Sequence, residues 1–200
     1  MERHELTELH YITSIDNLPS IFRYGLLSHN RANRFKPASI ADPIVQNRRS
    51  PKIIPNGLPL HDYVNLYINA RNKMMYVRRN QHEDICVLRI DCGVIDLPNV
   101  VIADCNAASD WVRFYSSPSG LKHIDRDEVF AAYWTHPDDR NETLRHGSVM
   151  CAEVLVPQQV NVCYIVGVYA SSDAAQRKLV ALNLPVDIQQ NGYMFFIPHY

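Results

Sequence analysis

Residues 149–169 read VMCAEVLVPQQVNVCYIVGVY, and this stretch decides the class of fold. Two apolar runs rich in β-branched residues, 149–156 and 162–169, lie on either side of a Pro-Gln-Gln break. Runs of this length and composition around a turn predict two β-strands. Glu153 is the one charged residue inside them.

Further strands and a few helices surround this pair. The sequence predicts strands at 8–13, 63–69 and 85–90, weaker ones at 100–103 and 110–114, and a last one at 193–197. It predicts helices at 15–22, 73–77, 125–134 and 172–183, and a polar loop at 135–147. Because strands outnumber helices and do not alternate strictly with them, we expect an α+β fold in one domain, residues 1–200.

The segment from about residue 27 to 60 has no regular periodicity. Five prolines interrupt it, and a short helix within 40–49 is the element that its apolar spacing allows. Eleven Lys or Arg residues and two Asp residues lie between Arg23 and Arg79, so this part of the chain has a formal charge of +9 and the remainder −10. A long irregular segment with such a charge is typical of a loop that binds phosphate groups or nucleic acid.

The composition, 46% hydrophobic and 20% charged, is that of an ordinary globular protein. It excludes a disordered tail, a collagen-like rod and a coiled coil. No apolar run approaches the roughly 18 residues of a membrane span. The N-terminus, MERHELTELH, lacks the apolar core of a secretory signal. We therefore expect a cytoplasmic protein with no membrane contact.

Several common site signatures are missing from the sequence. It contains no GxGxxG, GxxxxGK[ST], HExxH or GxSxG motif. The five cysteines include no CxxC pair, and their apolar neighbours predict reduced thiols in or near the core. The histidines show no ligand spacing, so we expect no metal site.

Glu153 and the strand at 8–13 supply the first candidate site residues. A carboxylate in an apolar strand either faces water at a sheet edge or lies in a cleft, because burial without a partner is costly. Arg145 and His146 precede it as a candidate rim of that cleft. His10 is either a structural histidine or a ligand contact, and Thr13 and Asn17 place polar groups nearby that could bind a ribose or an amide.

Arginines and tyrosines supply the remaining candidates. Arg48 and Arg49 lie in the basic loop, where a guanidinium suits a phosphate. In HDYVNLYINARNKMMYVRR, tyrosines alternate with cations such as Arg71 and Arg78. Alternate tyrosines on a strand either pack one face of a sheet or offer stacking planes beside a cationic groove for single-stranded nucleic acid.

Four segments together resemble the DarT family of DNA ADP-ribosyltransferase toxins. They are LHYITSIDNLPSIFRYGLLS, IADPIVQNRRS, LHDYVNLYINARNKMMY and AEVLVP, in order from about residue 9 to 156. The resemblance implies an ADP-ribosyltransferase fold similar to that of poly-ADP-ribose polymerases, with central sheets forming an NAD-binding cleft. It also implies transfer of ADP-ribose from NAD to a base of single-stranded DNA, commonly thymidine in a short sequence context. Such a toxin blocks DNA replication, and a macrodomain antitoxin, DarG, removes the mark.

The resemblance also assigns roles to residues of this sequence. Glu153 matches the catalytic glutamate, and Arg48, with Arg49 as its close rival, matches the arginine implicated in catalysis. The expected NAD contacts are His10, Thr13, Asn17, Leu26, Arg48 and Tyr67. The expected nucleic-acid contacts are Arg49, Tyr63, Asn65, Arg71, Met75, Arg78, Arg145 and His146.

The chemistry of the residues agrees with these roles. Cleavage of the NAD glycosidic bond develops positive charge on the ribose, which a carboxylate such as Glu153 stabilises. Arginine is a poor base because its pKa exceeds about 12, so Arg48 is expected to position substrates and supply charge.

Alternatives remain open at the level of sequence. The lead-in TLRHGSVMCAEVLV is less basic than in many thymidine-modifying members, so guanine is a second candidate acceptor. An RNA-modifying transferase and a non-catalytic nucleic-acid-binding module are the other two readings. The sequence predicts a monomer, because it has no long apolar surface helix.

Overall fold

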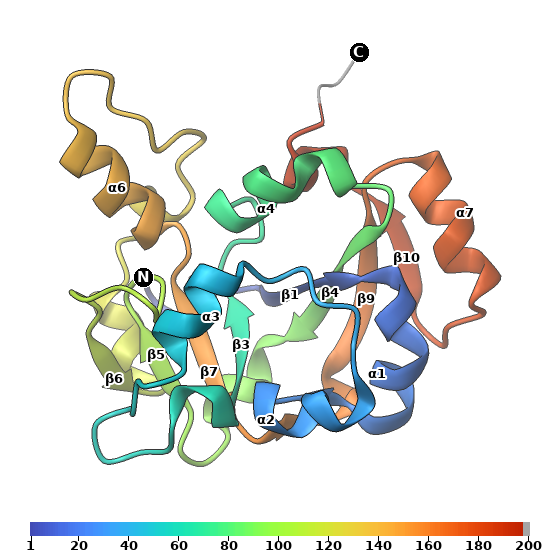
Figure 1. Cartoon of the computed structure of the whole chain (residues 1–200), viewed down its shortest axis with the longest axis horizontal. Coiled ribbons are helices and arrows are strands. Elements are labelled where there is room, and N and C mark those ends of the chain that lie inside the picture. Colours follow the sequence, from blue (N-terminus) through green and yellow to red (C-terminus); the bar gives the residue numbers. More distant parts are fainter. Residues whose placement is uncertain (198–200) are drawn as a thin grey trace.

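One mixed β-sheet forms the centre of the molecule. In the computed structural model, which describes residues 1–197, eight strands follow the order β10-β9-β4-β1-β3-β7-β5-β6 (Figure 1). Only β9 and β10 are parallel neighbours. The strands are β1 Glu8–Ser14, β3 Tyr63–Tyr67, β4 Ile85–Asp91, β5 Val101–Ala103, β6 Phe114–Ser116, β7 Glu153–Pro157, β9 Ile165–Ala170 and β10 Asp187–Gln190, with a separate pair β2 Leu26–Leu27 and β8 Gln159–Val160.

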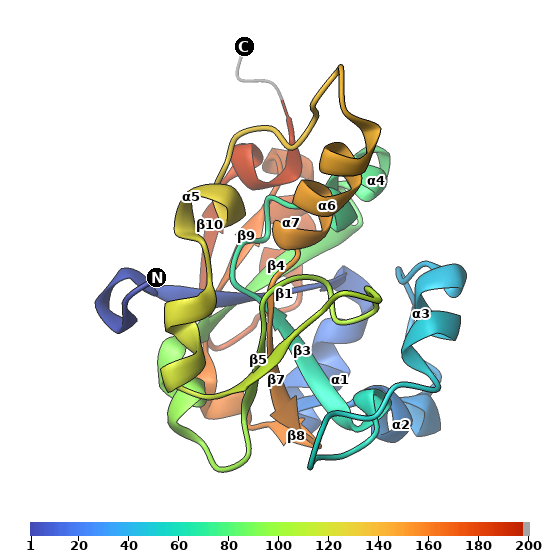
Figure 2. The ribbon, with the colours of Figure 1, turned by 90° about the vertical axis from the view of Figure 1, so that its left-hand side faces the viewer.

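The sheet has two halves that meet at one residue pair. β1 pairs with β4 over seven positions, and β3 pairs with β7 over five, but β1 and β3 are joined only where His10 lies opposite Tyr67. Figure 2 shows β1 running across the direction of β3 and β7. The two halves therefore diverge from the His10–Tyr67 pair.

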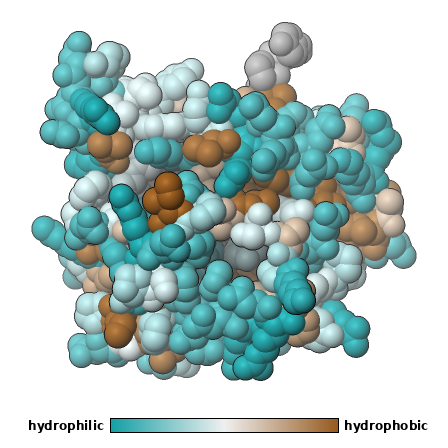
Figure 3. All heavy atoms as spheres, viewed as in Figure 1, coloured by the Kyte–Doolittle hydropathy of each residue, from teal (hydrophilic) through white to brown (hydrophobic). Residues whose placement is uncertain are grey.

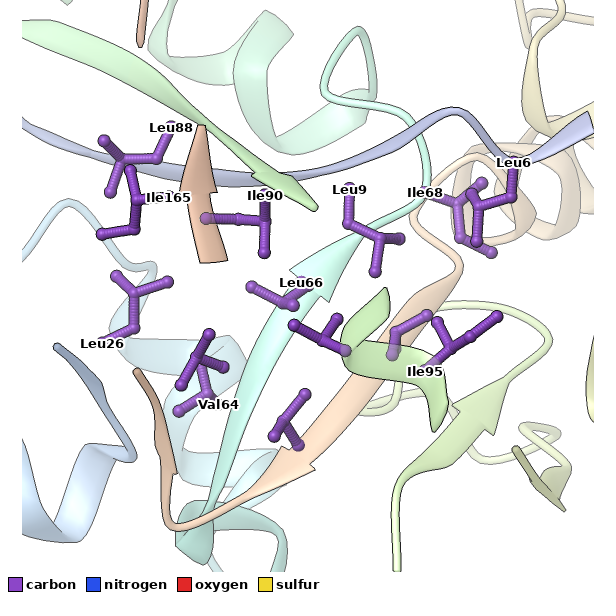
Figure 4. Close-up of a cluster of buried hydrophobic side chains, with 14 of the residues drawn as sticks. Leu6, Leu9, Leu26, Val64, Leu66, Ile68, Leu88, Ile90, Ile95 and Ile165 are labelled. Atoms are coloured by element: carbon purple, nitrogen blue, oxygen red, sulfur yellow. The ribbon is translucent and has the colours of Figure 1, made fainter. Parts of the chain in front are cut away.

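The main hydrophobic core covers one face of this sheet. Leu9, Leu66 and Leu88 are fully buried there (Figure 4). Val154 of β7 belongs to the same core. Helices on that side contribute their apolar residues to it, as Leu18 and Leu179 do. The α-helices within residues 1–197 are α1 Leu18–Tyr24, α2 His29–Ala32, α3 Pro43–Arg49, α4 Lys73–Arg78, α5 Arg126–Val129, α6 Arg140–Val149 and α7 Asp173–Ala181.

Two smaller apolar clusters lie on the other face. One contains Ile12, Tyr67 and Met75, and the other contains Leu60 and Leu155. In the register of β7, Glu153 and Leu155 point to the same face, so the carboxylate lies between these two clusters. This face therefore carries the polar residues that the sequence singles out.

The α+β class and most strands are confirmed, with shifted boundaries. β1, β3, β4, β5 and β9 lie where strands are predicted. The strand predicted at 110–114 is wrong, because β6 begins only at Phe114. The last strand predicted at 193–197 is also wrong, since Gly192–Phe195 is a 3-10 helix and the final strand is β10.

The segment before Glu153 differs most from expectation. The predicted polar loop at 135–147 contains most of α6, which ends at Val149. Met150 and Cys151 then form a turn, so the strand begins at Glu153 and not at Val149. Asp139 caps it by accepting a hydrogen bond from the Glu142 amide at 2.9 Å. The sequence of this helix shows no apolar stripe, because the residues that it buries are His146 and Gly147.

Two further expectations need correction. The helix predicted at 125–134 ends at Val129, followed by turns. All five cysteines are free, and Cys86, Cys105 and Cys151 are buried, but Cys163 is exposed and is not a core thiol. Within residues 1–197, no helix has both the length and the apolar character needed to cross a membrane.

Candidate active site

Three candidate residues form a row across adjacent strands. His10 of β1 lies opposite Tyr67 of β3, and Tyr67 lies opposite Glu153 of β7. Directly paired residues share a face of the sheet, with Cβ atoms about 4.5–5.5 Å apart. The register therefore brings an imidazole, a phenol and a carboxylate together at the point where the two halves of the sheet diverge.

Arg49 binds the carboxylate at the end of this row. Its Nη1 and Nη2 atoms donate to Oε1 and Oε2 of Glu153 at 3.0 and 3.1 Å. The Ala107 amide donates to Oε1 at 3.0 Å. Glu153 has 0% of its surface exposed, and Arg49 is buried as well. Although burial opposes it, the Glu153 carboxylate raises the pKa of Arg49, so the guanidinium stays charged.

Helix α3 determines which arginine of the pair reaches the carboxylate. Asp42 caps the helix by accepting a hydrogen bond from the Ile44 amide at 2.8 Å, and Pro43 occupies its first turn. Consecutive residues of a helix point about 100° apart, so only one of two neighbours faces the sheet. Arg49 does so, and Arg48 lines the cavity beside it.

A cavity of about 930 Å³ lies over this part of the sheet. Its wall includes Thr13, Asn65 and Tyr67 from the strands, together with residues of α3, α4 and α6. The face in Figure 3 is hollowed near its centre, and hydrophilic residues surround much of the hollow. The volume is at the upper end of the range of small-molecule and cofactor sites.

The cavity wall is strongly cationic. It contains Lys36, Arg48, Arg49, Lys73 and Arg78, against the two carboxylates of Asp42 and Asp110. Within residues 1–197, Arg49 is the only one of these cations that forms an ion pair. Unpaired cations around a concave site favour an anionic ligand.

Asn17 fastens a loop across one end of the cavity. Its side-chain amide donates to the Ala38 carbonyl at 2.9 Å and to Thr13 Oγ1 at 3.1 Å, and its Oδ1 accepts from the Ala38 amide at 2.9 Å. Residues 36–42 line the cavity next to this contact. The side chain of Asn17 thus fixes the loop to the end of β1.

His10 is fixed from the other side by a carboxylate. Its Nε2 lies 3.1 Å from Oε1 of Glu8, which also accepts from Tyr169 Oη at 2.9 Å, while Glu8 Oε2 accepts from Arg89 Nε at 2.8 Å. These three partners outweigh burial and lower the pKa of Glu8 to about 2. The Nδ1 atom of His10 is buried with no partner among the described residues.

The sequence model of one protein family, described as "ssDNA thymidine ADP-ribosyltransferase, DarT", matches residues 10–195. The chain belongs to the DarT family. A DNA ADP-ribosyl transferase of Thermus sp. (strain 2.9) is 31% identical over 150 residues, which cover 69% of this chain and 71% of that protein. A fusion protein of a DNA ADP-ribosyl transferase and a DNA ADP-ribosyl glycohydrolase from Thermosipho africanus is 29% identical over 96% of this chain. The chain spans about half of that fusion protein, namely 50% of its length.

The fold of the family is also shown by a solved structure. Thermus sp. 2.9 DarT in complex with ADP-ribosylated ssDNA superposes with a TM-score of 0.82 at 25% identity, covering 96% of this chain and 97% of that one. The ADP-ribosyltransferase fold that the sequence resemblance implied is thereby confirmed.

Several residues matched to the DarT family lie at this cavity. Among the expected NAD contacts, Thr13, Asn17, Arg48 and Tyr67 line it, and His10 adjoins Tyr67. Leu26 does not: its side chain is buried in the main core, and its neighbour Leu27 lines the cavity instead. The pairing of β2 with β8 turns Leu26 inward.

The expected DNA contacts separate into two groups. Those that line the cavity are Arg49, Tyr63, Asn65 and Arg78. Met75 is fully buried beneath it, where α4 packs on the sheet, and its neighbour Met74 lines the cavity. The guanidinium of Arg71 lies against the Tyr193 and Phe196 rings and donates to the Tyr193 carbonyl.

The structure places Arg145 and His146 away from the main cavity. Arg145 binds the carboxylates of Glu128 and Glu142. His146 is buried, with its Nε2 3.0 Å from the Glu128 carbonyl and its Nδ1 3.0 Å from His136 Nε2. Both residues fasten α6 to α5, so their side-chain atoms are engaged within the protein.

Sequence reasoning missed part of the site. The loop 104–113 contributes the Ala107 amide to Glu153 and several cavity residues, including Trp111. Lys36 and Lys73 lie in the basic segment, whose charge alone does not show that they line the cavity. A backbone amide leaves no signal in a sequence, whereas the lone Trp in a polar segment could have been noticed. No group of three or more His, Cys, Asp or Glu residues suited to a metal occurs in residues 1–197.

Proposed function

We propose that this chain transfers ADP-ribose from NAD to a base of single-stranded DNA, with thymidine as the acceptor. The observation that carries the proposal is the His10–Tyr67–Glu153 row beside a cation-lined cavity. It occurs in a member of a family described as acting on thymidine in single-stranded DNA.

The cavity suits a dinucleotide donor. Its volume of about 930 Å³ and its unpaired cations match a large ligand with a diphosphate. The Thermosipho africanus relative has been solved with ADP-ribose, and Thermus sp. 2.9 DarT with NAD+. Loop 36–42, fastened by Asn17, and the Arg48 guanidinium are the groups that we assign to the donor.

Glu153 is the residue that we assign to the reacting ribose. During transfer the bond from ribose C1′ to the nicotinamide nitrogen breaks, its electron pair leaves with nicotinamide, and C1′ bonds to a ring nitrogen of the base. Positive charge develops on the ribose as the bond breaks, and a desolvated carboxylate stabilises that charge more strongly than one in water. Burial, and then Glu153, hold the pKa of Tyr67 well above its ordinary value, so Tyr67 stays a neutral ring beside the ribose.

The acceptor nitrogen of thymine must also lose a proton. Arg49 stays charged and cannot take it, but a cation near the base favours the deprotonated form. Glu153 can accept the proton once Arg49 has released one of its oxygens. Arg49 therefore has a positioning and electrostatic role at the acceptor.

The proposal extends to the biological setting of the chain. The Thermosipho africanus relative is named as a fusion of a DNA ADP-ribosyl transferase with a DNA ADP-ribosyl glycohydrolase. We infer that this chain works as a toxin opposed by a DarG-type glycohydrolase, in the cytoplasm where NAD and replicating DNA are found. Addition of ADP-ribose to template bases would block replication.

An acceptor comparison tests the proposed function. The protein is incubated with NAD and with one sequence presented as single-stranded DNA, duplex DNA or RNA, and nicotinamide release and adducts are measured. We expect adducts on single-stranded DNA, lost when its thymidines are replaced. Adducts on RNA alone would identify an RNA-modifying enzyme, and unchanged NAD with bound, unmodified DNA would identify a binding module.

A further inference from the structure

A second cavity adjoins the main one. It has a volume of about 620 Å³ and lies among the loop 104–113, α5 and α6. Trp111 and Leu144 line both cavities, so together they form the boundary between them. A strand that extends from the main cavity into the second would pass over this boundary.

Trp111 differs sharply from the other tryptophan of the chain. Trp134 is 8% exposed and makes edge contacts with the Tyr76 and Phe196 rings. Trp111 is 54% exposed and takes part in none of the ring pairs found in residues 1–197. An exposed, unstacked indole beside a cavity has a free face for a planar ligand.

Hydrogen bonds hold the loop that carries Trp111 at several points. At its base, the Asp104 amide donates to the Arg113 carbonyl at 3.3 Å, and the Arg113 amide donates to Asp104 Oδ1 at 2.9 Å. The backbone amide of Asn106 donates to the Ser148 carbonyl at 2.9 Å, and the Lys52 ammonium donates to the Ser109 carbonyl. A fixed aromatic side chain loses little conformational entropy when a ligand stacks on it.

The same loop touches the reacting centre. The Ala107 amide donates to Glu153 Oε1 at 3.0 Å. Four residues of extended chain span at most about 14 Å, so Trp111 lies within that distance of Ala107 along the backbone. The loop that carries the indole therefore also contacts the Glu153 carboxylate.

Free hydrogen-bonding groups surround the second cavity. Its carboxylates already have partners within the protein. Glu128 binds Arg145, Asp125 caps α5, and Asp104 accepts a hydrogen bond from the backbone amide of Arg113. The side chains of Arg113 and Asn141 form no hydrogen bond with the described residues and are exposed. Arginine and asparagine side chains recognise the edges of guanine and adenine, respectively.

We infer that the second cavity holds the base of a nucleotide next to the modified one, stacked on Trp111. Arg113 and Asn141 lie at the edge of that base and give the enzyme a preference for its identity. The inference rests on the proposed action on single-stranded DNA and adds the residue that reads the neighbouring base. The continuity of the two cavities favours a nucleic-acid strand over a protein partner.

Tryptophan fluorescence tests the stacking directly. A thymidine-containing single-stranded oligonucleotide is titrated into the protein, with fluorescence anisotropy of a labelled copy reporting binding. We expect saturable quenching of tryptophan emission in the wild type. Trp111→Phe should bind the oligonucleotide within a few-fold of wild type but lose the quenching. Quenching that persists in Trp111→Phe, or binding without quenching in the wild type, would overturn this inference but not the proposed function.

Affinity and flanking preference complete the test. We expect Trp111→Ala to weaken oligonucleotide binding about tenfold, within the range for loss of one base stack. With oligonucleotides randomised beside the acceptor, sequencing of modified products should show a preference at one neighbouring position that Trp111→Ala loses. The matched control is Tyr133→Ala, which removes a 76% exposed aromatic that lines neither cavity. Equal effects of the two alanine variants would overturn the inference, and absence of any DNA binding would overturn the proposed function with it.

Discussion

Arg49 covers Glu153. Its guanidinium occupies both carboxylate oxygens at 3.0 and 3.1 Å, and Arg49 lines the cavity while Glu153 is fully buried behind it. The ion pair fixes the carboxylate in the fold. It also means that Arg49 must shift before Glu153 can contact a donor ribose.

Loss of Arg49 should therefore affect both stability and catalysis. Arg49→Ala leaves a buried carboxylate without its counter-charge, which costs about 3–5 kcal/mol of unfolding free energy. We expect urea unfolding to show this loss and DNA modification to fall below detection. Arg49→Lys keeps the charge but cannot bind both oxygens, so it should recover part of the stability and little of the activity.

Arg48 provides the matched control for Arg49. It is the preceding residue of α3, lines the same cavity and forms no ion pair within the described residues. Arg48→Ala should leave the unfolding free energy within about 0.5 kcal/mol of wild type. Equal destabilisation by the two alanine variants would show that the Arg49–Glu153 pair does not hold the site together.

Asn17 should act on donor binding through loop 36–42. Asn17→Asp cannot donate to the Ala38 carbonyl, and the loop loses one of its two hydrogen bonds to this side chain. We expect KM for NAD to rise several-fold with a smaller change in kcat, and amide exchange to quicken in residues 36–42. A fall in kcat alone, with unchanged exchange in the loop, would contradict this role.

The unpaired cavity cations should determine the salt dependence of DNA binding. The logarithm of the binding constant falls with the logarithm of salt concentration, with a slope of about −0.7 per phosphate contacted in a single strand. Lys73→Gln and Arg78→Gln should each reduce the magnitude of the slope by about 0.7 if each cation contacts one phosphate. Arg177→Gln on α7, which lines neither cavity, should leave the slope unchanged.

Glu8 should make the free energy of unfolding depend on pH in the acidic range. Its pKa is about 2 in the folded protein and near 4.5 when unfolded, so between these values the unfolded chain binds more protons. The contribution of Glu8 is complete above about pH 4.5 and is lost as the pH falls towards 2, at up to about 1.4 kcal/mol per pH unit. The difference in unfolding free energy between wild type and Glu8→Gln should shrink over that range. If the difference in unfolding free energy between the two proteins stayed constant over this pH range, the lowered pKa of Glu8 would be contradicted.

The sequence predicts the sheet better than the segments around it. The β-branched runs at 63–67, 85–91 and 165–170 form strands because their apolar residues pack one face of the sheet. The helix α6 escapes detection because it has no apolar stripe: the residues that it buries are His146 and Gly147. Asp139 is a local start signal, but the bond of Arg145 to Glu128 of α5 depends on the fold. The final strand β10 is exposed and carries polar residues, so it has no apolar pattern to detect.

The sequence predicts which residues form the site, but not which residues they contact. The sequence singles out Glu153 and the arginine pair, but only the orientation of α3 decides that Arg49 reaches the carboxylate. His10, Tyr67 and Glu153 are separated by more than 50 residues in each step, and strand register alone brings them together. Arg145 and His146 show the opposite case, since their proximity to Glu153 in sequence suggests the rim of its cleft. The structure instead engages both with α5 and places Arg145 at the second cavity.

The most direct test of the account is mass spectrometry at the level of single nucleosides. A single-stranded DNA pool is incubated with NAD and either wild-type protein or Glu153→Gln, after circular dichroism has shown that the variant is folded, and is then digested to nucleosides. We expect thymidine carrying one ADP-ribose with the wild type and none with Glu153→Gln, although the variant still binds the DNA. Equal modification by both proteins, or no modified nucleoside with the wild type, would contradict the account.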